Sequence, residues 1–534
     1  MSYFTTSNDI TRKTDWWLVL VYIALSILGL AAVYSANYQP DVVIADFGAL
    51  LKTSFGRQLT WVSISIVLAI VIQLFDRRFL IGIAPIVYLV VMLLLLAVFL
   101  FGVERNGANS WLIIGPIQFQ PSEIAKYATT GMVAFILSGL TSNINNPKDF
   151  ILTSLVLVIP MLFILLQGDA GTMIVFTGFI FVLYREGLSV WFLIFYFAVI
   201  ALFVLTLRFS TYEPRTLAIL DSGYSQIIGY IGSAICLISC FFFTKNTVLN
   251  FIAFALLILT GLALYFIVQQ EWTPMQLWGI VVALIFANLI GYFITKHSSL
   301  MLGSGLVLFY MFPQLQSNPL MLVGMLSVVV VFSFLGSLLL KNTGMLALSI
   351  LGFIGLYAQA IVSFLVPLMG RYQLERFLII MDLVKDSQGS GYNLRQSLIA
   401  IGSGGLLGKG YLKGTHIRGD FVPEVDTDFI LCPIGEELGF VGIALLIVLF
   451  VFLLIRIIVV AEKQQSNYTR IFGYSVASIF FIHFLINMSM VIGLAPVIGI
   501  PMPFISRGGS AFLGFTILLF TFIRLDSDKK NIVR

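Results

Sequence analysis

The sequence has 534 residues, of which 59% are hydrophobic and only 10% are charged. Ordinary soluble domains carry about 25% charged residues, so this composition excludes a soluble globular protein. The formal net charge of +5 arises from 30 basic and 25 acidic side chains and gives no indication of nucleic-acid binding. Many apolar runs of about 18 to 25 residues predict an all-α fold, a polytopic transmembrane helical bundle.

The first three predicted spans cover residues 16–36, 58–75 and 80–101. Arg12 and Lys13 precede the first span, and the positive-inside rule places them in the cytoplasm. The first apolar run is as long as a full span and exceeds the apolar core of a signal peptide. We therefore expect it to be retained as a helix.

The loop and helix at 104–131 contain the first informative polar residues. Pro121 suits the first turn of a helix, and Glu123 and Lys126 are spaced to share one helix face. One interpretation is a helix start with a local ion pair. The other is that this acid and base face a polar cavity, because charges at the edge of a span are costly in lipid.

Asp169 lies between two predicted spans, 152–167 and 173–184, with glycine on its N-terminal side and Gly171 close behind. A carboxylate there is a candidate functional group by default. The alternative is a helix cap over the amides that follow. A further span is expected at 190–207.

Residues 209–369 are apolar and nearly featureless, and we count about six further runs there. With these, we favour a total of about 16 spans over the alternative of 14. An even number of runs keeps the next polar segment on the outer side of the membrane.

Residues 389–439 form a segment too polar to face lipid, and we expect a folded loop at the outer membrane surface. Cations suit phosphate or pyrophosphate groups, and a neighbouring carboxylate could act as a general base. The run at 402–410 resembles a phosphate-binding loop but lacks the nucleotide-binding pattern, so a glycine-rich reversal and a ligand contact both stay open. The charged residues from 371 onward include Arg371, Arg376, Lys385, Arg395, Lys409, Lys413, Arg418, Asp420, Glu424, Asp426 and Asp428.

Three spans, at 439–460, 471–491 and 511–525, close the chain. Prolines and glycines at 490–510 predict broken helix that is shielded by protein. The basic tail after 525 predicts a cytoplasmic C-terminus, so both termini are expected inside.

Four stretches of the chain resemble the SEDS family (shape, elongation, division and sporulation) of polytopic peptidoglycan glycosyltransferases. They are NGANSW with QFQPSEIAK at 106–126, QGDAGT at 167–172, the segment from YQLER to VPEVDTDFI at 372–430, and GLAPVIGIPMPFIS with GGS near the end. Within the family, GKGYLKGT followed by FVPE resembles the RodA, or elongation, branch more than the FtsW, or division, branch.

The resemblance implies a role for particular residues. Asp428 matches the family's essential aspartate, the proposed catalytic residue, and Glu123 and Lys126 match the acid and base of a PSE-x-x-K motif. Arg395 precedes the matching pair Gln396 and Ser397. We also assign Asp169, Arg376, Lys409 and Glu424 to the substrate site. The chain departs from the family pattern at Asp426, where many members have His, at Arg507, where Tyr is common, and at Asn109, Ser110, Gly168 and Ala170.

The resemblance also implies a SEDS-like ten-helix core, with about six extra helices added to it. We expect the core to comprise 1–208 and the C-terminal helices of 434–534, with 209–369 as an insertion and 370–433 as a large extracytoplasmic catalytic loop.

The implied reaction polymerises lipid II into glycan strands at the outer face of the bacterial cytoplasmic membrane, for cell elongation and rod shape. Asp428 would remove the proton of the attacking sugar hydroxyl, and the nearby charge of Asp426 would repel a charge on Asp428. Lys126, Arg376, Arg395 and Lys409 would stabilise the leaving undecaprenyl pyrophosphate, with or without a divalent cation such as Mg²⁺. The implied partner is a class B penicillin-binding protein, and the polyprenyl tails would lie among membrane lipids in grooves between helices.

Other functions stay open at this stage. A lipid II flippase or transporter would also have broken helices and charges within the membrane. A scaffold would use the same helices only to dock a synthase, and a division-specific, FtsW-like polymerase would perform the same reaction elsewhere in the cell.

Overall fold

A computed structural model of the chain describes residues 14–38, 47–105, 108–114, 117–139, 142, 144, 146–190, 192–194, 196–197, 200, 390–419 and 421–527. Its contacts divide the chain into two compact units, Met1–Ser189 with Gly370–Arg534, and Val190–Met369. The predicted insertion at 209–369 and most of the predicted span at 190–207 lie outside the described residues. The insertion therefore stays a prediction.

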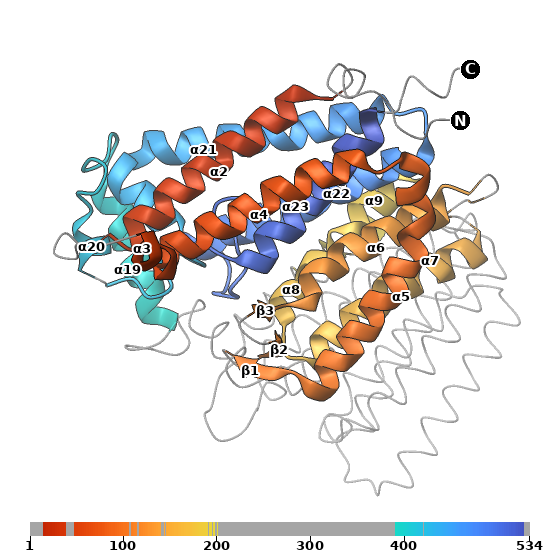
Figure 1. Ribbon diagram of the computed structural model, residues 1–534, viewed down its shortest axis with the longest axis horizontal. Coiled ribbons are helices and arrows are strands. Elements are labelled where there is room, and N and C mark those ends of the chain that lie inside the picture. The colour runs from red at the N-terminus through yellow and green to blue at the C-terminus, as the bar shows by residue number, and fades with distance from the viewer. Residues whose placement is uncertain are drawn as a thin grey trace, which may run out of the picture. The chain divides into compact units, whose positions relative to one another are not determined.

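The first unit is a bundle of long helices (Figure 1). Its N-terminal half contains α2 (Trp16–Ala36), α3 (Phe47–Lys52), α4 (Ser54–Leu74), α5 (Arg77–Phe101), α6 (Pro121–Leu137), α7 (Pro147–Leu166), α8 (Ala170–Thr177) and α9 (Phe179–Arg185). Its C-terminal half contains α19 (Ser390–Ser403), α20 (Thr415–Arg418), α21 (Leu431–Glu462), α22 (Asn467–Val491) and α23 (Gly509–Ser527).

Seven of the described helices are long and apolar enough to cross a membrane, namely α2, α4, α5, α7 from Lys148, α21, α22 and α23. The predicted span at 16–36 is confirmed as α2, and the spans predicted near 58–75, 80–101, 152–167, 471–491 and 511–525 correspond to helices within a few residues. The fold is therefore the predicted polytopic helical bundle.

One small sheet adds to this helical fold. Strands β1 (Val103–Arg105), β2 (Ala108–Ile114) and β3 (Ile117–Phe119) pair antiparallel in that order and connect α5 to α6. In β2 and β3, Leu112 faces Phe119 and Ile114 faces Ile117. The backbone N–H of Asn109 donates to the carbonyl of Gln167 at 2.8 Å, which fastens the sheet to the turn between α7 and α8.

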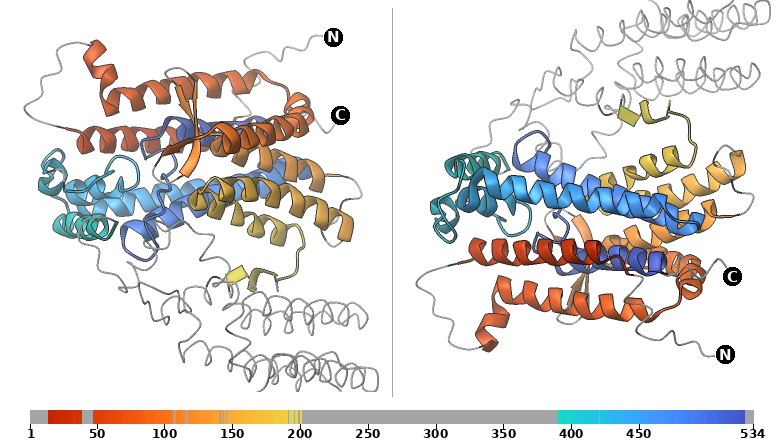
Figure 2. Two further views of the ribbon diagram at one scale, coloured as in Figure 1. Left: turned by 90° about the horizontal axis from the view of Figure 1, so that it is seen from below. Right: turned by 90° about the horizontal axis from the view of Figure 1, so that it is seen from above.

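Helices from the two halves of the first unit pack against each other. Helix α22 contacts α21, α6, α9 and α23, and α4 packs along α23. Figure 2 shows α21 running beside α2, in agreement with their contacts. The core is rich in phenylalanine, and Phe480, Phe504 and Phe515 meet with ring centroids 5.3–6.0 Å apart. Helices α22 and α23 are the most buried of the seven long apolar helices, so the two together form the centre of this packing.

Helix α21 begins eight residues before the span predicted at 439–460, and it is kinked at Gly439, where φ is 64°. At the kink, the N–H of Phe440 donates to the carbonyl of Gly405 at 2.9 Å, and that of Val441 to Leu406 at 3.1 Å. The glycine-rich loop thus accepts the hydrogen bonds that the broken helix cannot make. The acidic residues before Gly439, which obscured the start of the helix in the sequence, are buried against this loop.

Candidate functional site

Asp428 belongs to a tight turn between α20 and α21. Glu424 adopts a left-handed backbone conformation, with φ of 51°, and its carbonyl accepts N–H bonds from Thr427, Asp428 and Phe429 at 3.1–3.3 Å. Such a conformation is uncommon for a residue with a side chain. The Thr427 hydroxyl adds a bond to the Glu424 carboxylate at 3.1 Å. Glu424 itself is exposed, and the turn presents Asp428 half-buried at its end.

A side chain of α22 holds the backbone of Asp428 in place. The side-chain amide of Asn487, which is fully buried, donates to the carbonyl of Asp428 at 3.1 Å and to that of Ile500 at 2.7 Å. Gly499 has φ of 78°, and a Cβ added there would lie 3.2 Å from Oδ2 of Asp428. The Asp428 carboxylate therefore lies against the loop that connects α22 to α23, predicted from the sequence as broken helix.

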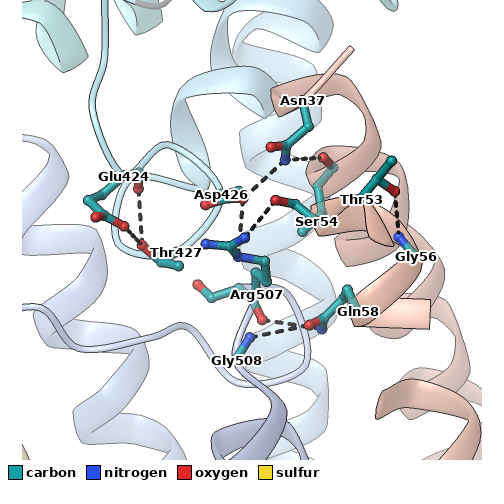
Figure 3. Close-up of polar contacts among 12 residues, drawn as sticks. Asn37, Thr53, Ser54, Gly56, Gln58, Glu424, Asp426, Thr427, Arg507 and Gly508 are labelled. Carbon is teal, nitrogen blue, oxygen red and sulfur yellow. Dashed lines mark hydrogen bonds and ion pairs between the residues drawn. The ribbon is translucent and has the colours of Figure 1, made fainter. Parts of the chain in front are cut away.

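Asp426 and Arg507 join the same turn to that loop (Figure 3). The Arg507 guanidinium Nε lies 3.1 Å from Oδ2 of Asp426, and the Arg507 backbone N–H donates to the Asp426 carbonyl at 2.8 Å. Asn37, at the end of α2, donates to the same carboxylate at 3.0 Å. Arg507 also donates to the Ser54 hydroxyl of α4 at 2.6 Å.

This pairing bears on one expectation from the sequence. The charge of Asp426 was expected to repel a charge on Asp428. In the structure the Arg507 guanidinium and the Asn37 amide both face the Asp426 carboxylate. These contacts offset part of the charge of Asp426, and the repulsion between the two aspartates stays a prediction.

Glu123 and Lys126 form the local ion pair that their spacing predicts. Lys126 Nζ lies 2.7 Å from Oε2 of Glu123, with the two side chains 1% and 3% exposed. Lys126 also lies 2.9 Å from Nε2 of His483 on α22 and 5.0 Å from the centre of the Phe515 ring. The pair is enclosed by protein on all these sides, so a direct substrate contact would require it to be uncovered.

The contacts of His483 define its tautomer. An ammonium group can only donate, so Nε2 of His483 must accept from Lys126. The proton then resides on Nδ1, which lies 3.1 Å from the carbonyl of Pro501 and donates to it. Lys126 on α6 is in this way connected through α22 to the loop that contacts Asp428.

Asp169 caps a helix, which was one of its two sequence interpretations. Its carboxylate accepts from the Thr172 N–H at 2.9 Å and from the Thr172 hydroxyl at 2.8 Å, at the start of α8. Gln120, the residue before α6, donates to it at 2.9 Å. A Cβ added at Gly171 would lie 2.8 Å from a methyl carbon of Ile498, so α8 also packs closely on the loop between α22 and α23.

Lys409 contacts a carboxylate of the protein. Its Nζ lies 2.6 Å from Oε1 of Glu436, which is fully buried, and 2.8 Å from the Thr415 hydroxyl. Glu436 also accepts the backbone N–H groups of Thr415, His416 and Ile417 at 2.8–3.1 Å, the first turn of α20. Together these bonds fix the glycine-rich reversal against α21, whereas a ligand contact of Lys409, which is 27% exposed, stays a prediction.

Tyr411 connects the same reversal to α2. Its hydroxyl donates to the carbonyl of Ala31 at 3.1 Å. Partial burial raises the pKa of Tyr411, and the nearby Glu437 carboxylate raises it further. The phenol therefore keeps its proton and remains a donor.

The remaining site residues lie on or before α19. Ser397 is buried and donates to the carbonyl of Val491 at 3.0 Å, which anchors α19 to the end of α22. Arg395 is exposed, and Gln396 is partly exposed. Arg376 lies outside the described residues, so its placement stays a prediction.

The sequence did not single out several residues that hold this site together. Glu436 had a usable signal, because two acids at the start of an apolar run are costly unless they are paired. His483 was a lone histidine within an apolar helix and gave a weaker one. Nothing in the spacing of Asn37, Gln58 or Asn487 indicated that they contact loops far away in the chain.

A divalent cation at the Asp428 turn would draw on the carboxylates of Asp428 and Glu424. Mg²⁺ is often bound by one or two carboxylates together with substrate phosphates, and Asp428 and Glu424 lie on the same turn. Within the described part of the chain, no group of three His, Cys, Asp or Glu side chains gathers as metal ligands.

Comparisons with known proteins match nearly the whole chain. A family model described as cell cycle protein, FTSW_RODA_SPOVE, matches residues 15–223 and 269–531. The peptidoglycan glycosyltransferase MrdB of Escherichia coli K12 is 26% identical over 528 residues, with 96% of each chain covered. The peptidoglycan glycosyltransferase RodA of Treponema pallidum is 25% identical over 503 residues, covering 93% of this chain and 94% of the relative.

A solved structure shares the fold. A chain from a peptidoglycan synthase complex, studied for the coordination of polymerization and crosslinking, superposes with a TM-score of 0.55 at 20% identity. The match covers 97% of this chain and 98% of that chain.

Proposed function

The chain belongs to the SEDS family of cell cycle proteins, and on this premise we propose that it is a peptidoglycan glycosyltransferase that polymerises lipid II at the outer face of the cytoplasmic membrane. The relatives named as peptidoglycan glycosyltransferases match it over nearly their full length. Because one of these is a RodA, the proposal assigns this chain to cell elongation.

The observation that carries this proposal is the convergence of distant stretches on the Asp428 turn and on the loop between α22 and α23 that lies against it. Asn487 bonds the backbone of Asp428, and Arg507 bonds Asp426 two residues earlier. The same loop between α22 and α23 contacts α8 at Gly171, and through His483 it is connected to Lys126 on α6. The half-buried Asp428 carboxylate is thus carried on a turn whose backbone is held by polar contacts, which supports its proposed role as a positioned acid–base group.

In the proposed reaction, a sugar hydroxyl of lipid II attacks the anomeric carbon of the growing glycan. A new C–O bond forms, and the bond from the anomeric carbon to the pyrophosphate oxygen breaks, releasing undecaprenyl pyrophosphate. The Asp428 carboxylate accepts the proton of the attacking hydroxyl as a general base. Its role depends on a fixed position, which the contacts of its turn supply.

The leaving pyrophosphate requires positive charge as it departs. Among the cations assigned from the sequence, Arg395 is exposed on α19 and Lys409 is partly exposed. These two, with Arg376, are the proposed pyrophosphate contacts. Lys126 is buried, and we assign its effect to the position of the loop that it contacts through His483.

The proposed orientation places both termini in the cytoplasm. Arg456 near the end of α21 pairs with Asp15 before α2 at 2.7 Å, and Gln464 just after α21 bonds to Asp526 in α23. The start of α2 and the end of α23 therefore lie at one end of the bundle, and the Asp428 turn lies before the start of α21, away from that end. Short basic turns such as Arg77–Arg78 favour the cytoplasmic side for this end.

The proposed partner is a class B penicillin-binding protein that crosslinks the new strands. The similarity in fold to a chain from a peptidoglycan synthase complex supports this choice. The proposed substrates are lipid II and the undecaprenyl pyrophosphate-linked glycan, with their lipid tails in the membrane.

The test is polymerisation of fluorescent lipid II by the purified full-length protein, with and without its cognate penicillin-binding protein made transpeptidase-inactive. The proposal predicts glycan strands of many lengths on a gel. If the protein makes no strands with any partner, yet moves labelled lipid II across the bilayer of sealed vesicles, it is a transporter and the proposal is wrong.

A further inference from the structure

Asp426 and Arg507 join the Asp428 turn to the loop between α22 and α23. Two bonds join them, one between the side chains at 3.1 Å and one from the Arg507 N–H to the Asp426 carbonyl at 2.8 Å. Backbone and side chain together fix both the distance and the orientation between the Asp428 turn and the loop between α22 and α23. A single exposed ion pair would contribute at most about 1 kcal/mol to holding them together.

The surroundings of this pair extend the constraint to two further helices. Asn37 at the end of α2 donates to Asp426, and Ser54 at the start of α4 accepts from Arg507. Beside them, the N–H of Gly508 donates to Gln58 of α4 at 3.2 Å (Figure 3). The Asp426 side chain is only 9% exposed and that of Arg507 is 31% exposed, so the pair is screened from solvent far more than an open surface pair.

The position of Asp428 is set from two directions. Asn487 holds its own carbonyl from α22, and Arg507 holds the turn two residues earlier through Asp426. Glu424 at the other end of the turn has a left-handed backbone, a conformation that persists only where the surroundings maintain it. Release of Asp426 would remove the side-chain contacts of the turn with Arg507 and Asn37 and leave its backbone less constrained.

We propose that Asp426 and Arg507 act as a positioning pair, which holds the turn so that the Asp428 carboxylate stays at the distance its reaction requires. This inference rests on the proposed function, because the experiment measures the reaction that Asp428 is proposed to catalyse. Neither residue is proposed to touch the reacting atoms. Displacement of a reacting group by about 1 Å can cost on the order of 100-fold in rate, so a small release of the turn is enough to be measured.

The chain offers a matched control. Arg456 and Asp15 form an ion pair of 2.7 Å whose side chains are 33% and 7% exposed, nearly the same as for Arg507 and Asp426. Asp15 precedes α2 and Asn37 follows it, so the two pairs lie at opposite ends of a helix of about 30 Å. Loss of the control pair removes similar electrostatics without touching the Asp428 turn.

The experiment measures polymerisation of lipid II and thermal unfolding for the full-length wild type, Asp426→Asn, Arg507→Gln, the double variant and Asp15→Asn. We expect kcat to fall about 10- to 100-fold in each single variant of the positioning pair, with KM nearly unchanged. The double variant should be little worse than either single one, because both remove the same contact. Asp15→Asn should keep the wild-type kcat while its unfolding temperature falls as much as that of Asp426→Asn.

Conservative variants separate positioning from folding. Asp426→Glu and Arg507→Lys keep the charges, and both should recover part of the lost kcat. If Asp426→Asn cannot be purified in a folded form, these two variants take its place in the comparison. An active wild type with unchanged kcat in Asp426→Asn and Arg507→Gln would overturn the inference and leave the proposed function intact. Equal losses of kcat in Asp15→Asn and Asp426→Asn would also overturn it. A wild type that makes no strands would instead contradict the proposed function.

Discussion

Lys126 of α6 and His483 of α22 are separated by 357 positions in the sequence, and yet Lys126 Nζ lies 2.9 Å from His483 Nε2 in the buried core. The other ring nitrogen of His483 contacts Pro501 at 3.1 Å. One imidazole therefore connects the helix that starts with Pro121 to the loop that lies against Asp428. The motif containing Glu123 and Lys126 is connected to the site through this contact.

His483→Ala should destabilise the protein by about 1–3 kcal/mol, because Lys126 loses an acceptor in a buried environment. Thermal unfolding of the purified protein would measure the change. Leu485→Ala is the control, since Leu485 lies on the same helix and is exposed. An unfolding temperature for His483→Ala as high as that of Leu485→Ala would show that the contact contributes nothing to stability.

Asp169 can be tested by comparing two substitutions. Asp169→Ala removes the cap of α8 and should cost about 0.5–2 kcal/mol, whereas Asp169→Asn keeps a capping oxygen and should cost less. If capping is its main role, Asp169→Asn should also keep most of the polymerase activity. Loss of activity in Asp169→Asn without loss of thermal stability would favour the other interpretation, a direct contact with substrate.

Glu436→Gln should be strongly destabilising. The carboxylate is fully buried and accepts from Lys409 and from the first N–H groups of α20. Hydrogen bonds to a charged group contribute about 1.5–3 kcal/mol each, and the neutral Gln side chain cannot replace all of those that Glu436 accepts. Glu462→Gln is the matched control, because its pair with Arg185 is 45% and 49% exposed and should contribute at most about 1 kcal/mol. Equal unfolding temperatures for the two variants would refute the prediction.

Gly499 and Gly493 provide a test of the space around Asp428. Both have φ of 78°, so alanine strains the backbone equally at the two positions. A methyl group at 499 would lie 3.2 Å from the Asp428 carboxylate, whereas one at 493 would meet only the Leu394 side chain at 3.5 Å. Gly499→Ala should therefore lower kcat more than Gly493→Ala at a similar unfolding temperature. The opposite order would place the reacting groups away from Gly499.

The sequence predicted the fold well because apolar run length is a local property. The helix at Trp16–Ala36 matched its predicted bounds, since nothing outside the run was needed to define them. The start of α21 was misplaced, because Glu436 looks like a loop residue until Lys409 and the N–H groups of α20 are known to surround it. The strands β1 to β3 are too short to give a periodic signal.

The sequence predicted which residues belong to the candidate site better than it predicted the contacts between them. Spacing alone identified the Glu123–Lys126 pair, because residues three apart meet on a helix. The pair of Asp426 and Arg507 joins two loops far apart in the chain, and no local rule brings them together. Both residues depart from the SEDS pattern, and the structure shows that they bond to each other.

The most direct test of the account is the rate of lipid II polymerisation by Asp428→Asn and Asp428→Glu, beside the wild type, each with the same transpeptidase-inactive partner. General base catalysis contributes about 10²- to 10⁴-fold, so Asp428→Asn should lose at least two orders of magnitude in kcat at an unchanged unfolding temperature. Asp428→Glu keeps a carboxylate and should retain more. A folded Asp428→Asn that polymerises at the wild-type rate would contradict the central claim that this turn carries the catalytic group.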